Sequence, residues 1–137
     1  MRRWIQRLGS RRAELDEAAF ALPVLLLVSL ALVNLAILGF AAVNAANAAE
    51  YAARVGSTAL TNPSSAAYNA AAAKLSAVRV GNYTVSVIGG GAPGARVDVA
   101  VTYQVPNYFG GLARLFGVSL PGQFQGTARA TFRQEGW

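Results

Sequence analysis

The order of apolar and polar residues divides the chain into two parts with different periods. Residues 18–43 form an apolar run without a charged side chain. Immediately after it, alanines recur at every fourth position, which is the spacing of neighbours along one face of an α-helix. From residue 83 onward apolar and polar residues alternate, as in a strand with one buried face. The pattern therefore predicts a long helix followed by a β-sheet.

The charge-free run is long enough to cross a lipid bilayer. Its 26 residues extend ~39 Å at about 1.5 Å per residue, and the hydrocarbon core of a bilayer is about 30 Å thick. A secretory signal peptide is the competing interpretation, but its apolar core usually has only about 7–15 residues. Residues 46–48 match a small-x-small cleavage pattern that an alanine-rich region produces by chance. We therefore interpret residues 18–43 as a transmembrane helix.

The helix is expected to continue beyond the membrane, to a total of about 40 residues, because residues 44–59 lack proline and are rich in alanine, the best helix former. Pro23 falls in the first turns, where a missing N–H costs least. Asn34 lies at mid-span, where a polar side chain usually faces another protein surface; the alternative is an asparagine tolerated in lipid. The residues expected to mediate packing of the transmembrane helix are Pro23, Asn34, Ala41, Ala45 and Ala49.

A second helix and a small sheet are expected next. The sequence Thr-Asn-Pro-Ser-Ser at residues 61–65 ends the first helix, and Ser64 or Ser65 can cap a second helix that ends at Gly81. Alternating segments follow at residues 83–88, 97–105 and 124–133. Each has one apolar face, which predicts an antiparallel sheet of about three strands covered by the helices. The expected fold class is therefore α+β.

An apolar segment lies between the last two strands. Residues 108–116 place large apolar side chains at helical spacing around Arg114. The segment is either a short helix packed on the core, which we favour, or an exposed apolar loop.

The distribution of charge predicts the orientation of the chain. The net charge is +6, and five arginines lie in the first twelve residues: Arg2, Arg3, Arg7, Arg11 and Arg12. By the positive-inside rule, the tail of residues 1–17 stays in the cytoplasm. Residues 18–43 then cross the bacterial inner membrane, and residues 44–137 form an extracytoplasmic domain. That domain lacks a stripe of basic residues interleaved with aromatics, so no nucleic-acid partner is expected.

The side chains needed for most catalytic chemistry are missing. The chain has no Cys and no His, which excludes disulfides, cysteine nucleophiles and His-based acid–base catalysis. Its six acidic residues form no obvious acid–base pair or metal cluster. The glycine-rich residues 89–94 lack the Lys-Ser/Thr ending of a phosphate loop and predict a hairpin turn. We therefore expect no enzyme activity, catalytic residue, metal, cofactor or small-molecule substrate.

The start of the apolar run carries a family resemblance. Residues 17–27, Glu-Ala-Ala-Phe-Ala-Leu-Pro-Val-Leu-Leu-Leu, keep a characteristic spacing from a glutamate to a Leu-Pro pair and a leucine run. With a basic tail before it and an α+β exterior after it, this sequence resembles the TadE-like minor pilins, or pseudopilins, of tight-adherence pili in the type IV pilin superfamily. The segments that resemble the closing strands of that family are residues 99–103, 115–120 and 127–135. The chain departs from the family at Ala18, where the family has Phe, and at Arg12, where it has a processing Gly.

The resemblance implies an assembly role for a carboxylate at the start of the helix. In pilins this carboxylate is thought to pair with the N-terminal amine of a neighbouring subunit, and a helix N-terminus also stabilises negative charge. Cleavage between residues 12 and 13 would make Glu17 that carboxylate, whereas cleavage between residues 9 and 10 would make it Glu14. Without cleavage, the acids pair with nearby arginines or a partner subunit, or simply cap the helix. The implied site residues are the carboxylates Glu17 and Glu14, the processing junction Arg12 and Ala13, and the weaker junction Gly9 and Ser10.

The expected function is that of a non-enzymatic, single-pass membrane protein that helps to assemble, prime or anchor a surface pilus or secretion filament. Its expected partners are the lipid bilayer and other membrane or pilin subunits, contacted through the N-terminal helix. The alternative is an uncleaved accessory subunit of a larger bacterial membrane complex, such as a respiratory or photosynthetic one. An extracytoplasmic enzyme or solute-binding domain has little support from the sequence.

Overall fold

The computed structural model describes residues 2–115 and 117–135, and for residues 2–16, 20 and 115 it describes the backbone alone. The elements in chain order are α1 (Arg2–Thr58), α2 (Pro63–Ser76), β1 (Asn82–Gly89), β2 (Arg96–Pro106), α3 (Phe109–Leu115) and β3 (Gln123–Arg133). A long apolar helix, a short helix and a three-stranded antiparallel sheet confirm the predicted α+β class.

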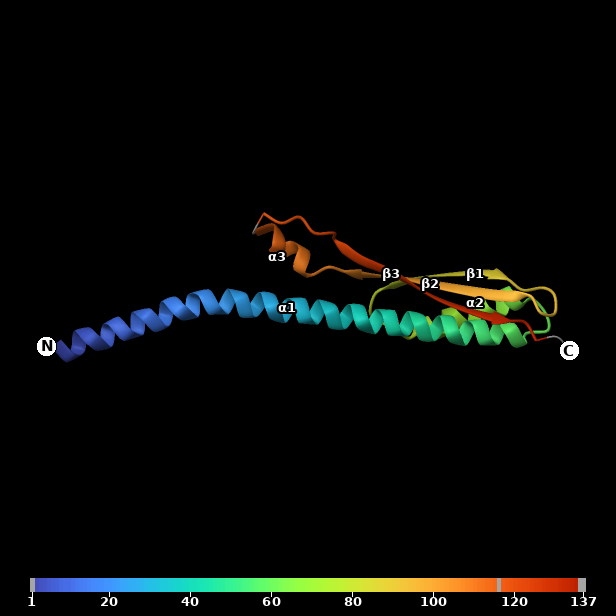
Figure 1. Cartoon of the computed structure of the whole chain (residues 1–137), viewed down its shortest axis with the longest axis horizontal. Coiled ribbons are helices and arrows are strands. Elements are labelled where there is room, and N and C mark those ends of the chain that lie inside the picture. The colour runs from blue at the N-terminus through green and yellow to red at the C-terminus, as the bar shows by residue number, and fades with distance from the viewer. Residues whose placement is uncertain (1, 116, 136–137) are drawn as a thin grey trace.

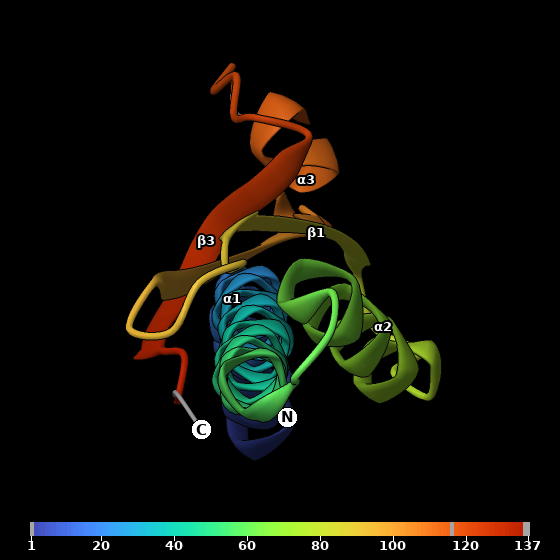
Figure 2. The ribbon, with the colours of Figure 1, turned by 90° about the vertical axis from the view of Figure 1, so that its right-hand side faces the viewer.

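Helix α1 extends along the whole molecule and continues through Pro23 without a break (Figure 1). Its end at Thr58 confirms that the apolar helix continues well beyond residue 43. The rest of the domain packs on the C-terminal half of α1. Seen along the helix axis, α2 lies against one side of α1 and the sheet lies across both helices (Figure 2).

Helix α2 begins after a residue in the left-handed conformation. Asn62 is the N-cap residue, with φ 50° and ψ 58°, and Pro63 occupies the first turn, where its fixed φ fits a helix. The predicted serine cap is wrong, because no side-chain cap hydrogen bond forms and the Ser64 hydroxyl donates to the carbonyl of Gly89 instead. The helix also ends at Ser76, five residues earlier than predicted. Ser64 therefore joins α2 to the β1–β2 turn.

The three strands form an antiparallel sheet with β2 in the centre. Val101 of β2 lies opposite Val85 on β1 and Ala128 on β3. The buried side chains of β2 are Val97, Val99, Val101 and Val105, which confirms the predicted alternation. The predicted hairpin turn at residues 89–94 is also confirmed. All four of its glycines have positive φ, a conformation that other residues rarely adopt.

A layer of alanines separates the helices from the inner face of the sheet. The core cluster contains Ala45, Ala48, Ala49, Ala52 and Ala53 of α1, Ala67 and Ala71 of α2, and Val97, Val99 and Val101 of β2. Small side chains allow the three layers to approach closely. At Gly56 even a Cβ atom would lie 2.9 Å from the Ala67 Cβ and 2.9 Å from the Val97 Cγ1. Glycine is therefore required where α1, α2 and β2 meet.

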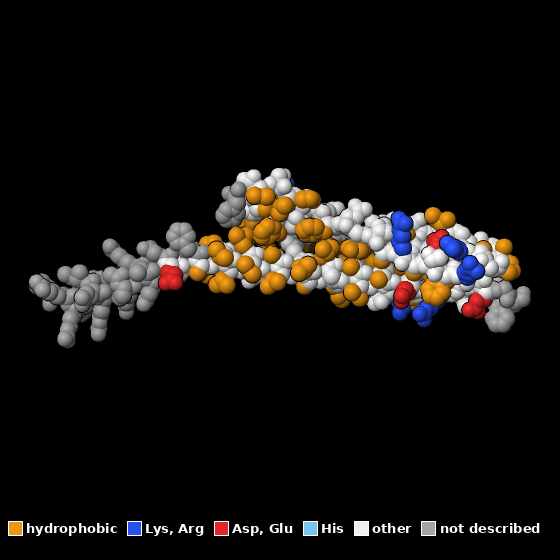
Figure 3. All heavy atoms as spheres, viewed as in Figure 1, with side chains coloured by type: hydrophobic (Ala, Val, Ile, Leu, Met, Phe, Trp, Pro, Cys, Tyr) orange, Lys and Arg blue, Asp and Glu red, His pale blue; other side chains and the backbone are white. Residues whose placement is uncertain are grey.

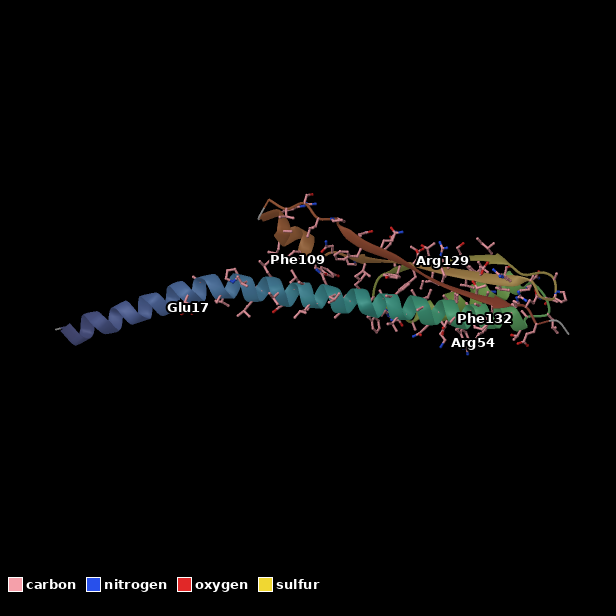
Figure 4. All side chains as sticks on the ribbon, viewed as in Figure 1. Glu17, Arg54, Phe109, Arg129 and Phe132 are labelled. Atoms are coloured by element: carbon pink, nitrogen blue, oxygen red, sulfur yellow. The ribbon has the colours of Figure 1, made fainter. Side chains whose placement is uncertain are left out.

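The C-terminal segment holds the end of α1 in place. The side chain of Gln134 donates to the carbonyl of Ala59 at 3.3 Å and accepts from the N–H of Gly91 at 3.0 Å. The Arg54 guanidinium lies over the Phe132 ring, 5.6 Å from its centroid (Figure 4). These contacts connect α1, the β1–β2 turn and β3 in one unit.

Candidate membrane and assembly surfaces

Residues 22–43 of α1 present a large apolar surface. Its exposed large side chains are Leu22, Val24, Leu25, Leu26, Val28, Leu32, Val33, Leu35, Phe40 and Val43. Within Glu17–Thr58, the most apolar 18-residue window has a mean hydropathy of 2.6 and is only 11% buried. The core helix of a soluble protein would be mostly buried, so this segment of α1 is not a core helix. In the described part of the chain, α1 is the one helix that is long and apolar enough to cross a membrane.

The structure argues against a cleaved signal peptide. Residues 46–48 lie in the middle of α1, and Ala48 is 1% exposed within the core cluster. Cleavage at this position would divide the core.

Glu17 lies at the beginning of the apolar surface, with its side chain exposed (Figure 4). The expectation that it lies at a helix N-terminus is wrong for the full-length chain, because α1 begins at Arg2, fifteen residues earlier. The helix dipole acts only within the first turn, so it does not stabilise Glu17 there. The remaining predicted residues belong to α1, but their side chains lie outside the described residues: Gly9, Ser10, Arg12, Ala13 and Glu14.

The predicted alanine ridge packs within the chain. Ala41, Ala45 and Ala49 are each 0% exposed, and the last two belong to the core cluster with α2 and the sheet. These alanines therefore pack against other elements of the same chain. The close helix–helix approach that they allow is confirmed, but between α1 and α2.

Asn34 faces a protein surface, and that surface belongs to the same chain. The side chain is 6% exposed, and its Oδ1 accepts a hydrogen bond from the N–H of Tyr108 at 3.3 Å. Its Nδ2 is buried and has no hydrogen-bond partner among the described residues. Pro23, by contrast, is exposed on the apolar surface. Asn34 thus joins α1 to a segment 74 residues away.

Helix α3 lies beside the middle of α1, apart from the main core (Figure 1). We call residues 107–115 and 117–122 the α3 lobe. The predicted short packing helix is confirmed, because Ala113 is 4% exposed and α3 packs against α1. It lies outside the main core cluster, however, and Tyr108 is 55% exposed. An apolar groove of about 270 Å³ runs between α1 and the lobe, lined by Ala31, Asn34, Leu35, Leu38, Phe109 and Phe124. Apolar side chains gather on both sides of this region in the space-filling view (Figure 3).

The outer face of the sheet is polar and hollowed. A depression of about 520 Å³ is lined by Ser86, Ile88, Asp98, Val99, Ala100, Thr102, Thr127, Arg129, Ala130 and Thr131. Within it the hydroxyls of Thr102 and Thr127 lie 3.0 Å apart, and Thr131 donates to the carboxylate of Asp98. The sequence pattern does not reveal this surface. Alternation shows which side chains point outward, but the depression depends on three strands that are distant in the sequence.

The described surfaces are suited to contact with lipid and protein. Among the residues whose side chains the structure describes, no group of three or more His, Cys, Asp or Glu could hold a metal ion. No protein-family model, curated protein or solved structure matches the chain.

Proposed function

We propose that the chain is a TadE-like minor pilin, or pseudopilin, that is anchored in the bacterial inner membrane and helps to assemble, prime or anchor a surface filament. The observation that carries the proposal is the exposed apolar half of α1, which begins at Glu17 and continues without a break into the core of an α+β domain. Such a helix can pack laterally against other subunits while the polar outer face of the sheet contacts neighbours outside the membrane.

Glu17 is the carboxylate that this function requires. In the full-length chain it lies far from the start of α1. Cleavage between residues 12 and 13 would place it at the fifth position of a shortened helix, close to the positive end of the dipole. A carboxylate among packed apolar helices needs a cationic partner. The new N-terminal amine of a neighbouring subunit supplies that cation.

A strain that lacks the protein provides the functional test. We expect it to make few or no filaments, and wild-type protein to restore them. Glu17→Gln, which keeps the shape but removes the charge, should fail to restore them. The control is Glu135→Gln, at an exposed position outside the membrane, which should restore filaments at equal protein levels in the membrane. Normal filaments in the strain without the protein would contradict the proposal.

The second candidate function is an uncleaved accessory subunit of a larger bacterial membrane complex. The arginine at position 12, where the resembling family has glycine, favours it. The intact mass and N-terminal sequence of the protein from native membranes separate the two. A chain that starts at Ala13 supports Glu17 as the assembly carboxylate, and a start at Ser10 transfers the role to Glu14. An uncleaved N-terminal tail favours the accessory subunit.

A further inference from the structure

We infer that the α3 lobe is a second membrane contact, which enters the outer leaflet and holds a phospholipid acyl chain in the groove against α1. The inference rests on the membrane-spanning role of α1 in the proposed function. It does not depend on whether the partners of the chain are pilins. It assigns a role to a segment that the anchoring helix alone does not explain.

The position of the groove along α1 gives its depth in the bilayer. The α1 wall of the groove extends from Ala31 to Leu38, inside the charge-free residues 18–43. At about 1.5 Å per residue, these two positions lie ~21 Å and ~32 Å along the helix from Glu17. A hydrocarbon core of about 30 Å that begins next to Glu17 therefore ends near Leu38. The lobe lies beside α1 at the level of the leaflet farther from the N-terminus.

The composition of the α3 lobe suits a position in the leaflet farther from the N-terminus, near the membrane interface. Between residues 99 and 128, Arg114 is the only charged residue. Tyr108 is 55% exposed and Val118 is 49% exposed. Tyrosine is favoured at membrane interfaces because its ring is apolar and its hydroxyl is hydrated. An arginine there can extend its guanidinium to a headgroup phosphate.

The lining of the groove favours a lipid chain as the occupant. Five of the six lining residues are apolar, and the exposed side chain of Leu35 connects the groove to the lipid-facing surface of α1. The polar exception is Asn34, whose buried Nδ2 donor has no partner among the described residues. The ester carbonyl of a phospholipid is a hydrogen-bond acceptor located near the boundary of the hydrocarbon core. An acyl chain in the groove thus brings its ester carbonyl to about the same level of the bilayer as Asn34.

Quenching of tryptophan fluorescence by brominated lipids tests the inference. The background is the full-length chain with Trp4→Phe and Trp137→Phe, in vesicles of phosphatidylethanolamine and phosphatidylglycerol with brominated acyl chains. Phe109→Trp reports on the groove, Leu25→Trp on the span, and Tyr68→Trp on the exposed surface of α2. We expect strong quenching for Phe109→Trp and Leu25→Trp, by at least twofold, and none for Tyr68→Trp.

The outcomes separate failure of this inference from failure of the anchor. If Leu25→Trp is quenched but Phe109→Trp behaves like Tyr68→Trp, the lobe lies outside the bilayer and the inference is wrong, while α1 still spans. If neither is quenched, both the span and the inference are wrong. Blue-shifted but unquenched emission from Phe109→Trp would show that protein, such as a second copy of the chain, fills the groove. Should Phe109→Trp not fold, Tyr108→Trp at the neighbouring exposed position tests whether the lobe enters the bilayer, and an unquenched Tyr108→Trp overturns the inference.

Discussion

Single side chains determine how closely the layers of the domain approach each other. Gly56 has no space for a Cβ atom between α2 and β2. Gly39, in the same helix, has no heavy atom within 4 Å of an added Cβ. The two glycines therefore form a matched pair, in which one is required by packing and the other is not.

We predict that Gly56→Ala destabilises the protein by about 1 kcal/mol. Alanine gains about 1 kcal/mol in helix propensity, but the added methyl group overpacks the junction at a cost of about 1–3 kcal/mol. Gly39→Ala should be neutral or stabilising. Denaturant unfolding of the full-length protein in detergent measures both. Equal stability of the two variants would show that the junction is not closely packed.

A second residue-scale prediction concerns Tyr83 on β1. Its hydroxyl is buried without a partner among the described residues, and burial raises the pKa of this phenol. Because an unpaired buried hydroxyl is unfavourable, Tyr83→Phe should stabilise the protein by about 1 kcal/mol at neutral pH. Tyr68→Phe is the control, since that side chain is 51% exposed.

The sign of the pH dependence follows from the direction of the pKa shift. The folded state holds the Tyr83 proton more tightly than the unfolded state, whose pKa is about 10. Stability is therefore unaffected by this titration below pH ~10 and falls as the pH rises from there through the folded pKa. Tyr83→Phe should show a smaller decrease in stability above pH ~10 than the wild type. An identical alkaline decrease would exclude Tyr83 as its source.

At the scale of elements, the chain contains two separate packing units on one helix. The C-terminal half of α1 packs against α2 and the sheet, whereas its middle packs against α3. The second unit is smaller. Within it, the hydrogen bond from the Tyr108 N–H to the Asn34 side chain joins the α3 lobe to α1. The position of α3 therefore depends on few contacts.

We predict that Asn34→Leu releases α3 from α1 without unfolding the sheet. Loss of a hydrogen bond of about 1 kcal/mol should accelerate exchange of the Tyr108 amide about fivefold. Amides of β2 should be unaffected. Ser29→Leu, an exposed position on the same helix, is the control. Hydrogen exchange of the protein in lipid nanodiscs measures both, and unchanged exchange at Tyr108 would contradict the assigned role of Asn34.

The regular elements could be predicted from the sequence because their periods are local properties. The alternation around Val99 and the alanine spacing around Ala45 each gave the correct element. The end of α2 was predicted too late in the chain, because no strong helix breaker lies between Ser76 and Gly81. The partner of Asn34 and the position of α3 could not be predicted, since both depend on contacts between segments far apart in the chain. Whether the alanine ridge faces its own domain or another subunit is likewise decided only by tertiary packing.

At the scale of the whole molecule, the structure is a long helix with its domain attached to one half (Figure 1). All α1 residues of the core cluster lie between Ala45 and Ala53. The core therefore does not require the apolar half of the helix.

We predict that a fragment of residues 44–137 is soluble and unfolds cooperatively. It retains every alanine of the core cluster and removes the exposed apolar surface of residues 22–43. A fragment of residues 54–137 should aggregate, because it uncovers the inner face of the sheet. Size-exclusion chromatography and thermal unfolding followed by circular dichroism test both fragments. A folded fragment 54–137 would contradict the role of the α1 alanines in the core.

The most direct test of the central claim, that the chain assembles with filament subunits, is to identify the proteins that copurify with it from native membranes. The tag belongs at the C-terminus, which lies at the opposite end of the molecule from the N-terminal processing site (Figure 1). We predict that pilins and other proteins of the pilus-assembly machinery copurify with wild-type protein, and that Glu17→Gln reduces their recovery. Copurification with respiratory or photosynthetic subunits, and with no pilus protein, would contradict the claim and identify the chain as an accessory subunit.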